Sequence, residues 1–326
     1  MQPFKFIPQL KPVLWGGHRI AQLKGLPDTG EPIGESWEIS AMPGHESVVA
    51  TGTDAGLTLV QLIAKYREQL LGLDVHRRYG DHFPLLIKII DAQQALSIQV
   101  HPSDELAARR HHCPGKTEMW YIVETQPQAV IMAGFNRTLT PAQFESLARN
   151  GLLEESITHY HSLPGDVFFL PAGTIHSIGA GNLLVEIQQA SDITYRVYDY
   201  DRRDANGQPR QLHLEQARDA IHYAPDTGIA SHCHATTAGQ TPVASCEHFC
   251  TSHLCVQGQH KIDWEPMRSF MVMTGIQGRV EVVTDGTCST PLAMGESVLI
   301  PACAASIEVQ GNGQLIMASI PQNIHS

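Results

Sequence analysis

The sequence predicts a mainly β protein built from two similar β modules, with a few short helices inserted in the first module. Two observations support this prediction. Short apolar runs are separated by frequent Gly and Pro residues, as in β-sandwiches and barrels, and one string of residues recurs late in the chain. A length of 326 residues suits two domains and allows a sizeable core.

The predicted strands are segments in which aliphatic, aromatic and β-branched residues dominate and turn residues lie on either side. They are residues 95–100, 119–123, 166–170, 183–187, 270–273, 279–283 and 297–300. Because these segments occur both early and late in the chain, each part of the chain has strands for a sandwich of its own.

Capping motifs predict three helices between the strands. Residues 58–61 (Thr-Leu-Val-Gln) form a capping box, which predicts a helix that runs to Leu71 and ends at the following glycine. Residues 140–143 (Thr-Pro-Ala-Gln) form a second box, with proline at the first helical position, and predict a helix to about Ala148. Ser103 precedes an acidic turn and is the predicted N-cap of a third helix.

An internal repeat predicts the division into modules. Residues 165–172 (Gly-Asp-Val-Phe-Phe-Leu-Pro-Ala) align with residues 295–302 (Gly-Glu-Ser-Val-Leu-Ile-Pro-Ala), and a polar stretch rich in Gly, Thr and Ala lies between the copies at 226–242. We therefore predict a first module over residues 1–225, with the helical insertions, and a degenerate second module over residues 226–326.

The two copies of the repeat differ at a residue with metal-binding chemistry. His176 follows the first copy, whereas Ser306 occupies the corresponding position after the second copy. Any site that needs this histidine therefore belongs to the first module.

Composition excludes several classes of protein. Lys and Arg number 22 against 33 Asp and Glu, and a net charge of −11 disfavours a nucleic-acid or anionic-membrane partner. The first eight residues contain no signal-peptide run, and no window approaches about 18 uninterrupted apolar residues. Seven irregularly spaced cysteines do not resemble a disulfide framework. We expect a cytoplasmic protein that is a monomer or homodimer.

Polar residues on separate predicted strands are candidate metal ligands. Gln99 and His101 point to the same face of one strand, because side chains two positions apart do so. Glu118 precedes another apolar strand, and His176 lies one short loop after a third. Two imidazoles, a carboxylate and an amide oxygen suit a divalent cation, with zinc as the default. Taken singly, a histidine at a strand end is more often a surface or hydrogen-bonded residue, and Gln99 alone would be interpreted as a solvent-facing residue of an alternating strand.

The same segments resemble a known family. Residues 96–102 (Leu-Ser-Ile-Gln-Val-His-Pro) and 115–121 (Gly-Lys-Thr-Glu-Met-Trp-Tyr) resemble the metal-binding signature of type I mannose-6-phosphate isomerases. Similar segments also occur at residues 15–17, 34–38, 83–88, 170–176 and 190–196. The resemblance implies two cupin (jelly-roll) modules and one zinc ion (Zn2+) per chain. It is closest to the short bacterial form, because the extended helical domain of longer members is missing.

Carried over position by position, the resemblance implies roles for individual residues and a reaction. The implied metal ligands are Gln99, His101, Glu118 and His176. The implied catalytic residues are Arg196, Lys116 and Glu186, and the implied substrate-binding residues are Lys88, Lys116 and Arg196. The reaction interconverts mannose 6-phosphate and fructose 6-phosphate through a cis-enediol, which a metal ion can stabilise as a Lewis acid.

Several alternatives stay open at this point. The base that moves a proton between C1 and C2 is either Lys116 or Glu186. The protein is alternatively an isomerase of another sugar phosphate, or a non-catalytic metal-binding cupin that senses sugars. A second zinc site among the Cys and His residues of 246–255 is disfavoured, because their spacings match zinc motifs poorly.

Overall fold

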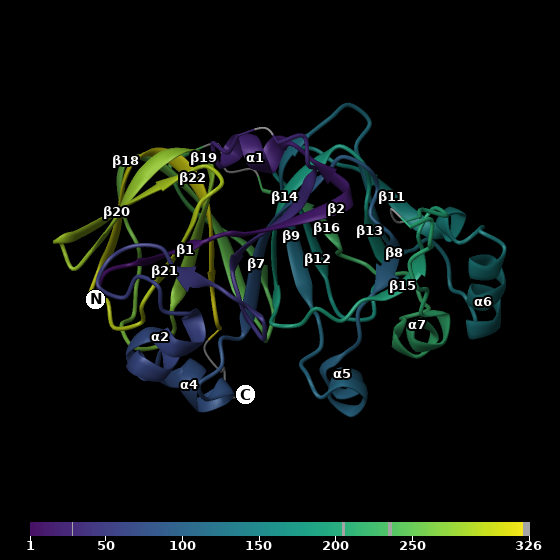
Figure 1. Ribbon diagram of the computed structural model, residues 1–326, viewed down its shortest axis with the longest axis horizontal. Coiled ribbons are helices and arrows are strands. Elements are labelled where there is room, and N and C mark those ends of the chain that lie inside the picture. Colours follow the sequence, from purple (N-terminus) through teal and green to yellow (C-terminus); the bar gives the residue numbers. More distant parts are fainter. Residues whose placement is uncertain (28, 204–205, 234–236, 322–326) are drawn as a thin grey trace.

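The computed structural model describes residues 1–27, 29–203, 206–233 and 237–321. Within these ranges the strands form three large antiparallel sheets (Figure 1). The largest sheet lies on the left of Figure 1, a second occupies the centre, and the third lies on the right beside helices α6 (Pro141–Arg149) and α7 (Leu214–Ala220). The central and right-hand sheets pack face to face as the first module, and the left-hand sheet belongs to the second.

The first module is a sandwich of a seven-stranded and a five-stranded sheet. The larger sheet has the order β16 (Ala230–His232), β12 (Asp166–Leu170), β9 (Glu118–Thr125), β14 (Asn182–Gln189), β7 (Leu85–Ala92), β2 (Gln9–Gly17) and β3 (Ile33–Ile39). The smaller sheet has the order β11 (Ile157–His161), β10 (Val130–Phe135), β13 (His176–Ile178), β8 (Ile98–Val100) and β15 (Tyr195–Tyr198).

Both faces of the larger sheet are covered, so β7 and β14 are buried along their whole length. Alternate residues point to opposite faces of a strand. On one face Ile90 and Trp120 pack in the core inside the sandwich. On the other face Ile89 and Met119 pack in a core shared with Phe270 of the second module. A strand covered on both faces needs apolar residues at nearly every position, which explains why only Lys88 and Asp91 interrupt the apolar sequence of β7.

The second module is one eight-stranded sheet with its own apolar core. Its order is β17 (Gly239–Ser245), β18 (Cys250–Lys261), β22 (Ile307–Ser319), β19 (Met271–Thr284), β21 (Ser297–Ile300), β1 (Phe4–Ile7) and β6 (Val48–Val49), with β20 (Cys288–Ala293) beside β19. A small pair, β4 (Ala41–Met42) and β5 (His45–Glu46), stands apart.

Three strands cross between the modules: β1 and β6 join the second module's sheet, and β16 joins the first module's. Strand β1 pairs with β21 of the second module, with Phe4 opposite Leu299. Strand β16, although it follows residue 226, pairs with β12 of the first module. The boundary between residues 1–225 and 226–326 stays a prediction, and sheet pairing ties the two parts together across it.

The repeated string forms equivalent strands in the two modules. In the first module β12 lies antiparallel to β9, and in the second β21 lies antiparallel to β19. The two segments predicted as separate strands at 270–273 and 279–283 are one long strand, β19, because a shift in register between Gly275 and Gln277 absorbs the irregularity without ending the strand.

The three predicted helices are present, one of them with a break. Helix α2 (Leu59–Tyr66) begins at the predicted capping box but ends at Arg67, whose φ of 45° is incompatible with a continuous helix; a short helix, α3 (Glu68–Leu71), follows. Helix α6 begins at the second predicted box. In α5 (Asp104–His111) the Ser103 hydroxyl accepts a hydrogen bond from the Leu106 N–H. The remaining helical segments are α1 (Arg19–Leu23), α4 (Leu73–Tyr79), α7 and a 3-10 turn at Glu154–Ser156.

All seven cysteines lie in the described ranges, and no disulfide bond joins any of them there. In the part of the chain that the structure describes, no helix is long and apolar enough to cross a membrane.

Gly72, between α3 and α4, lies directly against the backbone of the second module. Its φ is +97°, and a Cβ added there would lie 2.3 Å from the carbonyl oxygen of Arg268. The neighbouring Leu73 N–H donates to the Met267 carbonyl (2.7 Å), and the Phe270 N–H donates to the Leu71 carbonyl (2.9 Å). A side chain at Gly72 therefore has to push the two segments apart.

We predict that Gly72→Ala lowers the free energy of unfolding by about 2 kcal/mol or more beyond the loss in Gly80→Ala. Both glycines have positive φ, which costs about 1–2 kcal/mol for alanine, but a Cβ on Gly80 meets its nearest atom only at 3.9 Å. The difference between the two losses in unfolding free energy measures the collision of the added Cβ with the Arg268 backbone, which costs about 1–3 kcal/mol. Denaturant unfolding measures both variants, and equal losses would contradict the predicted contact.

Candidate functional site

Two rows of cross-strand neighbours line the inside of the first-module sandwich. Across β7, β14 and β9 of the larger sheet, the neighbours are Lys88, Glu186 and Trp120. Across β15, β8 and β13 of the smaller sheet, they are Arg196, Gln99 and His176. Directly opposite residues of adjacent strands place their side chains together on one face. Strand register therefore gathers residues that lie far apart in the sequence.

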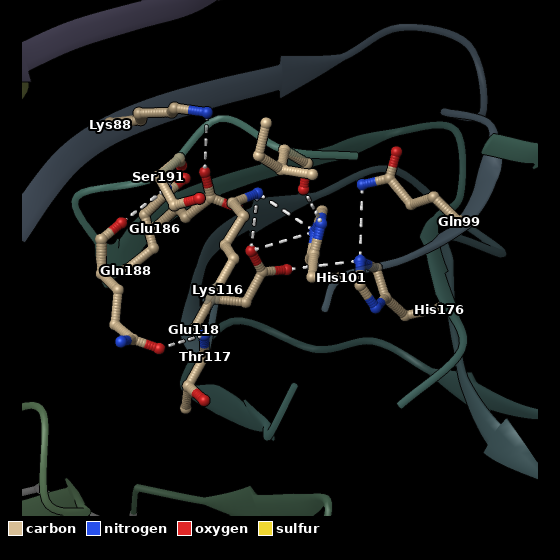
Figure 2. Close-up of polar contacts among 12 residues, drawn as sticks. Lys88, Gln99, His101, Lys116, Thr117, Glu118, His176, Glu186, Gln188 and Ser191 are labelled. Atoms are coloured by element: carbon tan, nitrogen blue, oxygen red, sulfur yellow. Dashed lines mark hydrogen bonds and ion pairs between the residues drawn. The ribbon is translucent and has the colours of Figure 1, made fainter. Parts of the chain in front are cut away.

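A buried cluster joins the two rows. His101, Glu118 and His176 each offer a ligand atom, and these atoms lie within 4.8 Å of one another. Glu118 Oε2 is 3.5 Å from His101 Nε2, and Glu118 Oε1 is 3.4 Å from His176 Nε2 (Figure 2). All three side chains are buried. Three of the four predicted metal ligands thus meet at one point between the sheets.

Backbone carbonyl groups orient both histidines of the cluster. His101 Nδ1 is 2.8 Å from the carbonyl oxygen of Ile193, and His176 Nδ1 is 2.9 Å from that of Thr174. A carbonyl oxygen only accepts, so each Nδ1 carries the proton and donates it, which leaves each Nε2 with a lone pair facing Glu118. Burial lowers the pKa of His176 to about 4 and that of His101 well below its ordinary value, so both rings are neutral at neutral pH.

Glu118 is a buried carboxyl group that Lys116 compensates only in part. Lys116 Nζ lies 2.8 Å from Oε2, and Oε1 accepts no hydrogen bond within the described structure. Burial raises the pKa of Glu118 to about 7, with the positive charge of Lys116 opposing the rise. Two neutral imidazole lone pairs and an under-satisfied carboxylate at one buried point form a donor set that fits a divalent cation.

Gln99 lies next to the cluster, but the structure presents its amide nitrogen rather than its oxygen. Gln99 Nε2 is 3.4 Å from His176 Nε2, and Gln99 Oε1 accepts a hydrogen bond from the Ser97 hydroxyl (3.2 Å). A half-turn of the amide exchanges the two atoms, and the Ser97 hydroxyl can donate or accept. Gln99 is therefore placed to be a fourth metal ligand. Its side-chain amide has to rotate in this way before its oxygen can bind the metal.

Lys88 and Glu186 form a buried ion pair beside the cluster. Lys88 Nζ is 3.2 Å from Glu186 Oε2 and 3.5 Å from Glu35 Oε2, and Trp120 Nε1–H donates to Glu186 Oε1 (2.9 Å). Burial disfavours the charged form of Glu186, but Lys88, Lys116 and the Trp120 hydrogen bond outweigh it and lower the pKa of Glu186 to about 2. The pKa of Lys88 is raised, because the nearby carboxylates outweigh burial. Both groups are therefore charged at neutral pH.

A cavity of about 280 Å³ connects these groups to the protein surface. Lys116 and Gln99 belong to its wall as well as to the cluster. Arg196 also lines the cavity; its Nε is buried and has no hydrogen-bond partner in the described structure, while its Nη1 donates to the Gln211 carbonyl (3.1 Å). Five of the predicted site residues thus line one cavity, namely Lys88, Gln99, Lys116, Glu186 and Arg196, whereas His101, Glu118 and His176 lie behind Lys116 and Gln99.

Several wall residues had no role in the sequence prediction. Trp120 and Glu35 lie within the segments that carried the family resemblance, so their positions were visible although their contacts were not. Arg210 and His213 lie beyond those segments, in a polar loop without periodicity. No spacing rule identifies residues of this kind, because an irregular loop brings them to the site.

The Cys- and His-rich segment 246–255 does not form a comparable cluster among the described residues, where the one group of three or more potential metal ligands is that of Glu118. His253 Nε2 hydrogen-bonds Gln314 Oε1 (2.9 Å), and Cys250 Sγ lies 3.1 Å from the Ser245 hydroxyl. The expectation that there is no second zinc site stays a prediction, and His234, which precedes this segment, lies outside the described residues.

The fold and the cluster together define the class: a cupin-type protein of two β modules, with a candidate metal centre inside the first. Comparison with known families narrows this class. Residues 4–131 match the family described as phosphomannose isomerase type I, catalytic domain, and residues 239–320 match the mannose-6-phosphate isomerase cupin domain.

Curated relatives match along the whole chain. The mannose-6-phosphate isomerase ManA of Bacillus subtilis is 34% identical, over 98% of this chain and 99% of the relative. The mannose-6-phosphate isomerase of Streptococcus mutans is 33% identical, over 97% of each chain. The chain therefore belongs to the type I mannose-6-phosphate isomerase family.

Solved structures share the fold over nearly the entire length. The crystal structure of the mannose 6-phosphate isomerase from Bacillus subtilis superimposes with a TM-score of 0.86 at 30% identity, covering 98% of this chain and 99% of that one. A mannose 6-phosphate isomerase described as bound with zinc and yttrium has a TM-score of 0.78 at 17% identity, covering 99% of this chain and 100% of that one.

We predict that zinc binding releases a proton in a pH-dependent way. At about pH 6 the Glu118 carboxyl group, with its pKa raised to about 7, holds a proton that a metal ligand has to lose, while both histidines are already neutral. About one proton per chain is expected to leave at pH 6, and far fewer at about pH 8.5. Calorimetric zinc titration of metal-free protein in buffers of different ionisation enthalpy counts these protons. The same release from Glu118→Gln would show that another group supplies the proton.

Proposed function

We propose that this protein interconverts mannose 6-phosphate and fructose 6-phosphate, with one zinc ion held by His101, Glu118, His176 and Gln99. The observation that carries the proposal is the buried His–Glu–His cluster, which meets a polar cavity through Lys116 and Gln99. Full-length similarity to relatives named for this reaction supports the choice of substrate.

The donor set supports zinc as the metal. Neutral imidazole nitrogens with carboxylate and amide oxygens are ligands that zinc accepts, and a relative of the same fold is described as bound with zinc and yttrium. Zinc held there would act as a Lewis acid for the oxygens on C1 and C2, where negative charge develops in a cis-enediol pathway.

The geometry favours Lys116 over Glu186 as the group that moves the proton between C1 and C2. Both oxygens of Glu186 are engaged, one by Trp120 and one by Lys88, and a pKa of about 2 makes this carboxylate a weak base. Lys116 Nζ lies at the cluster itself, 2.8 Å from Glu118 Oε2 and 3.1 Å from His101 Nε2, and also lines the cavity. Lys116 is thus the nearer proton carrier to the proposed reacting carbons.

The remaining residues are proposed to orient the sugar. Glu35 and Glu186 neutralise Lys88, so its ammonium group serves to hydrogen-bond sugar hydroxyl groups rather than to hold a free charge. Arg196 presents a buried Nε–H without a partner in the described structure, which suits a negatively charged oxygen of the substrate. Trp120 packs edge-on against the His176 ring (5.3 Å between centroids) and so fixes both the imidazole and Glu186.

The proposal is tested with a coupled assay for fructose 6-phosphate formed from mannose 6-phosphate, with protein as purified, after chelation and after zinc is restored. Activity is expected to disappear with the metal and to return with zinc. The His176→Ala variant serves as the control, since it is expected to recover neither bound zinc nor activity. Turnover that persists after complete metal removal would contradict the metal-dependent mechanism. Inactivity of folded, zinc-loaded protein would instead indicate another sugar phosphate or a non-catalytic cupin.

We predict that Lys116→Met lowers kcat by about a hundredfold or more, the usual contribution of a positioned acid or base. Glu186→Gln keeps an oxygen for Trp120 and is expected mainly to raise KM, because it leaves Lys88 poorly balanced. Steady-state kinetics together with deuterium uptake at C1 and C2 in heavy water separate the two effects. A larger loss of kcat and of deuterium uptake in Glu186→Gln would assign the proton transfer to Glu186.

A further inference from the structure

The inner part of the active-site cavity has no net positive charge to offer a phosphate group. Its wall carries Lys88, Lys116, Glu35, Glu186 and Asp192, and a fourth carboxyl group, that of Glu118, lies directly behind Lys116. A divalent cation at the cluster would bring the net charge of these groups to zero. Since a phosphate monoester carries a charge of about −1.5 to −2 at neutral pH, its binding site has to be sought elsewhere on the cavity wall.

A group of arginines supplies positive charge at another part of this wall. Arg202 and Arg210 both pair with the carboxylate of Asp199, and Arg196 lies close enough that Arg210 helps to lower its pKa, after the larger effect of burial. Three guanidinium groups against one carboxylate leave an excess of two positive charges, which matches a phosphate dianion.

Only part of this group faces the cavity. Arg196 and Arg210 line it, whereas Arg202 does not and instead donates to the Ala95 carbonyl (2.6 Å). Arg210 also lines an adjoining hollow beside Pro12 and Glu31, which places it at the boundary between the two hollows. Arg210 is thus the arginine at the edge of the cavity, and Arg202 secures Asp199 behind it.

His213 adds a neutral hydrogen-bond donor at the same place. Its Nδ1 accepts from the Arg196 backbone N–H (3.2 Å), and its own backbone N–H donates to the Arg196 carbonyl (2.7 Å). Because Nδ1 accepts, the ring proton of the neutral imidazole is on Nε2. Burial and the nearby Arg196 charge hold the pKa of His213 below its ordinary value, so the ring stays neutral. These backbone bonds fix the loop that carries Arg210 to strand β15.

We propose that Arg210 and His213, together with Arg196, form the subsite that binds the phosphate group of the substrate. The proposal rests on the proposed sugar-phosphate isomerase function and extends it to residues outside the segments that resemble the family. Arg210 already donates from Nε and Nη2 to Asp199, so the N–H groups at the tip of its guanidinium, on Nη1 and the second on Nη2, are the pair that remains for phosphate oxygens. His213 offers one more donor without further charge. The sugar end is then left to Lys88, Lys116 and the metal centre.

The experiment compares Arg210→Gln with Arg202→Gln, a matched control that removes the other guanidinium paired with Asp199. Two readouts are used: KM and kcat for mannose 6-phosphate, and binding of inorganic phosphate to the zinc-loaded protein by calorimetry. Arg210→Gln is expected to raise KM and to weaken phosphate binding by about tenfold or more, with a smaller change in kcat. Arg202→Gln removes a charge but no group that lines the cavity, so it is expected to have a clearly smaller effect on both than Arg210→Gln.

The possible results distinguish failure of the proposed phosphate subsite from failure of the proposed isomerase reaction. If Arg210→Gln leaves KM and phosphate binding unchanged, the proposed subsite is wrong. It is also wrong if Arg202→Gln weakens both as much as Arg210→Gln does, because the cause would then be a displaced loop. If wild-type protein binds phosphate but does not turn over mannose 6-phosphate, weaker binding in Arg210→Gln still supports the subsite while the proposed reaction fails. If Arg210→Gln does not fold, Arg210→Lys carries the test, since it keeps the charge for Asp199 but loses the planar pair of donors.

Discussion

The burial of Glu118 is the constraint around which the first module is organised. A carboxyl group at 0% exposure, with one oxygen that accepts no hydrogen bond in the described structure, is costly unless cations compensate it. Lys116 provides one compensating charge, and the two imidazole lone pairs beside Glu118 make a place for a metal ion to provide the rest. The burial of Glu118 beside two imidazole lone pairs thus costs folding free energy and also enables the site to bind a metal ion.

The second module contributes to the site without touching it. Its core residues, such as Phe270, cover the outer face of the seven-stranded sheet, so strands β7 and β14 are shielded from water on both faces. In this dry setting the Lys88–Glu186 pair on the inner face is weakly screened, and its attraction is strong enough to keep both groups charged. Strand β1, which joins the second module's sheet, helps to hold the two modules in this arrangement.

Much of the local structure and most of the site were predictable, for different reasons. Capping boxes depend on residues three positions apart, so the starts of α2 and α6 were correct, whereas the break at Arg67 depends on how α3 packs against the second module. Metal-binding chemistry is visible in residue type, so His101 and Glu118 stood out. Arg210 was not visible, because an arginine in an irregular loop has no local signature.

The sequence by itself determined the class of the protein: its alternation of short apolar runs and turns requires a β architecture, and its motifs identify the family and the candidate ligands. Only the tertiary structure decided which residues meet. Strand register places Lys88 opposite Glu186 and Arg196 opposite Gln99, and a shift of one residue would turn each of them to the other face. Register is set by pairing between distant segments and by the shared core, and neither can be read from the neighbours of a residue in the chain.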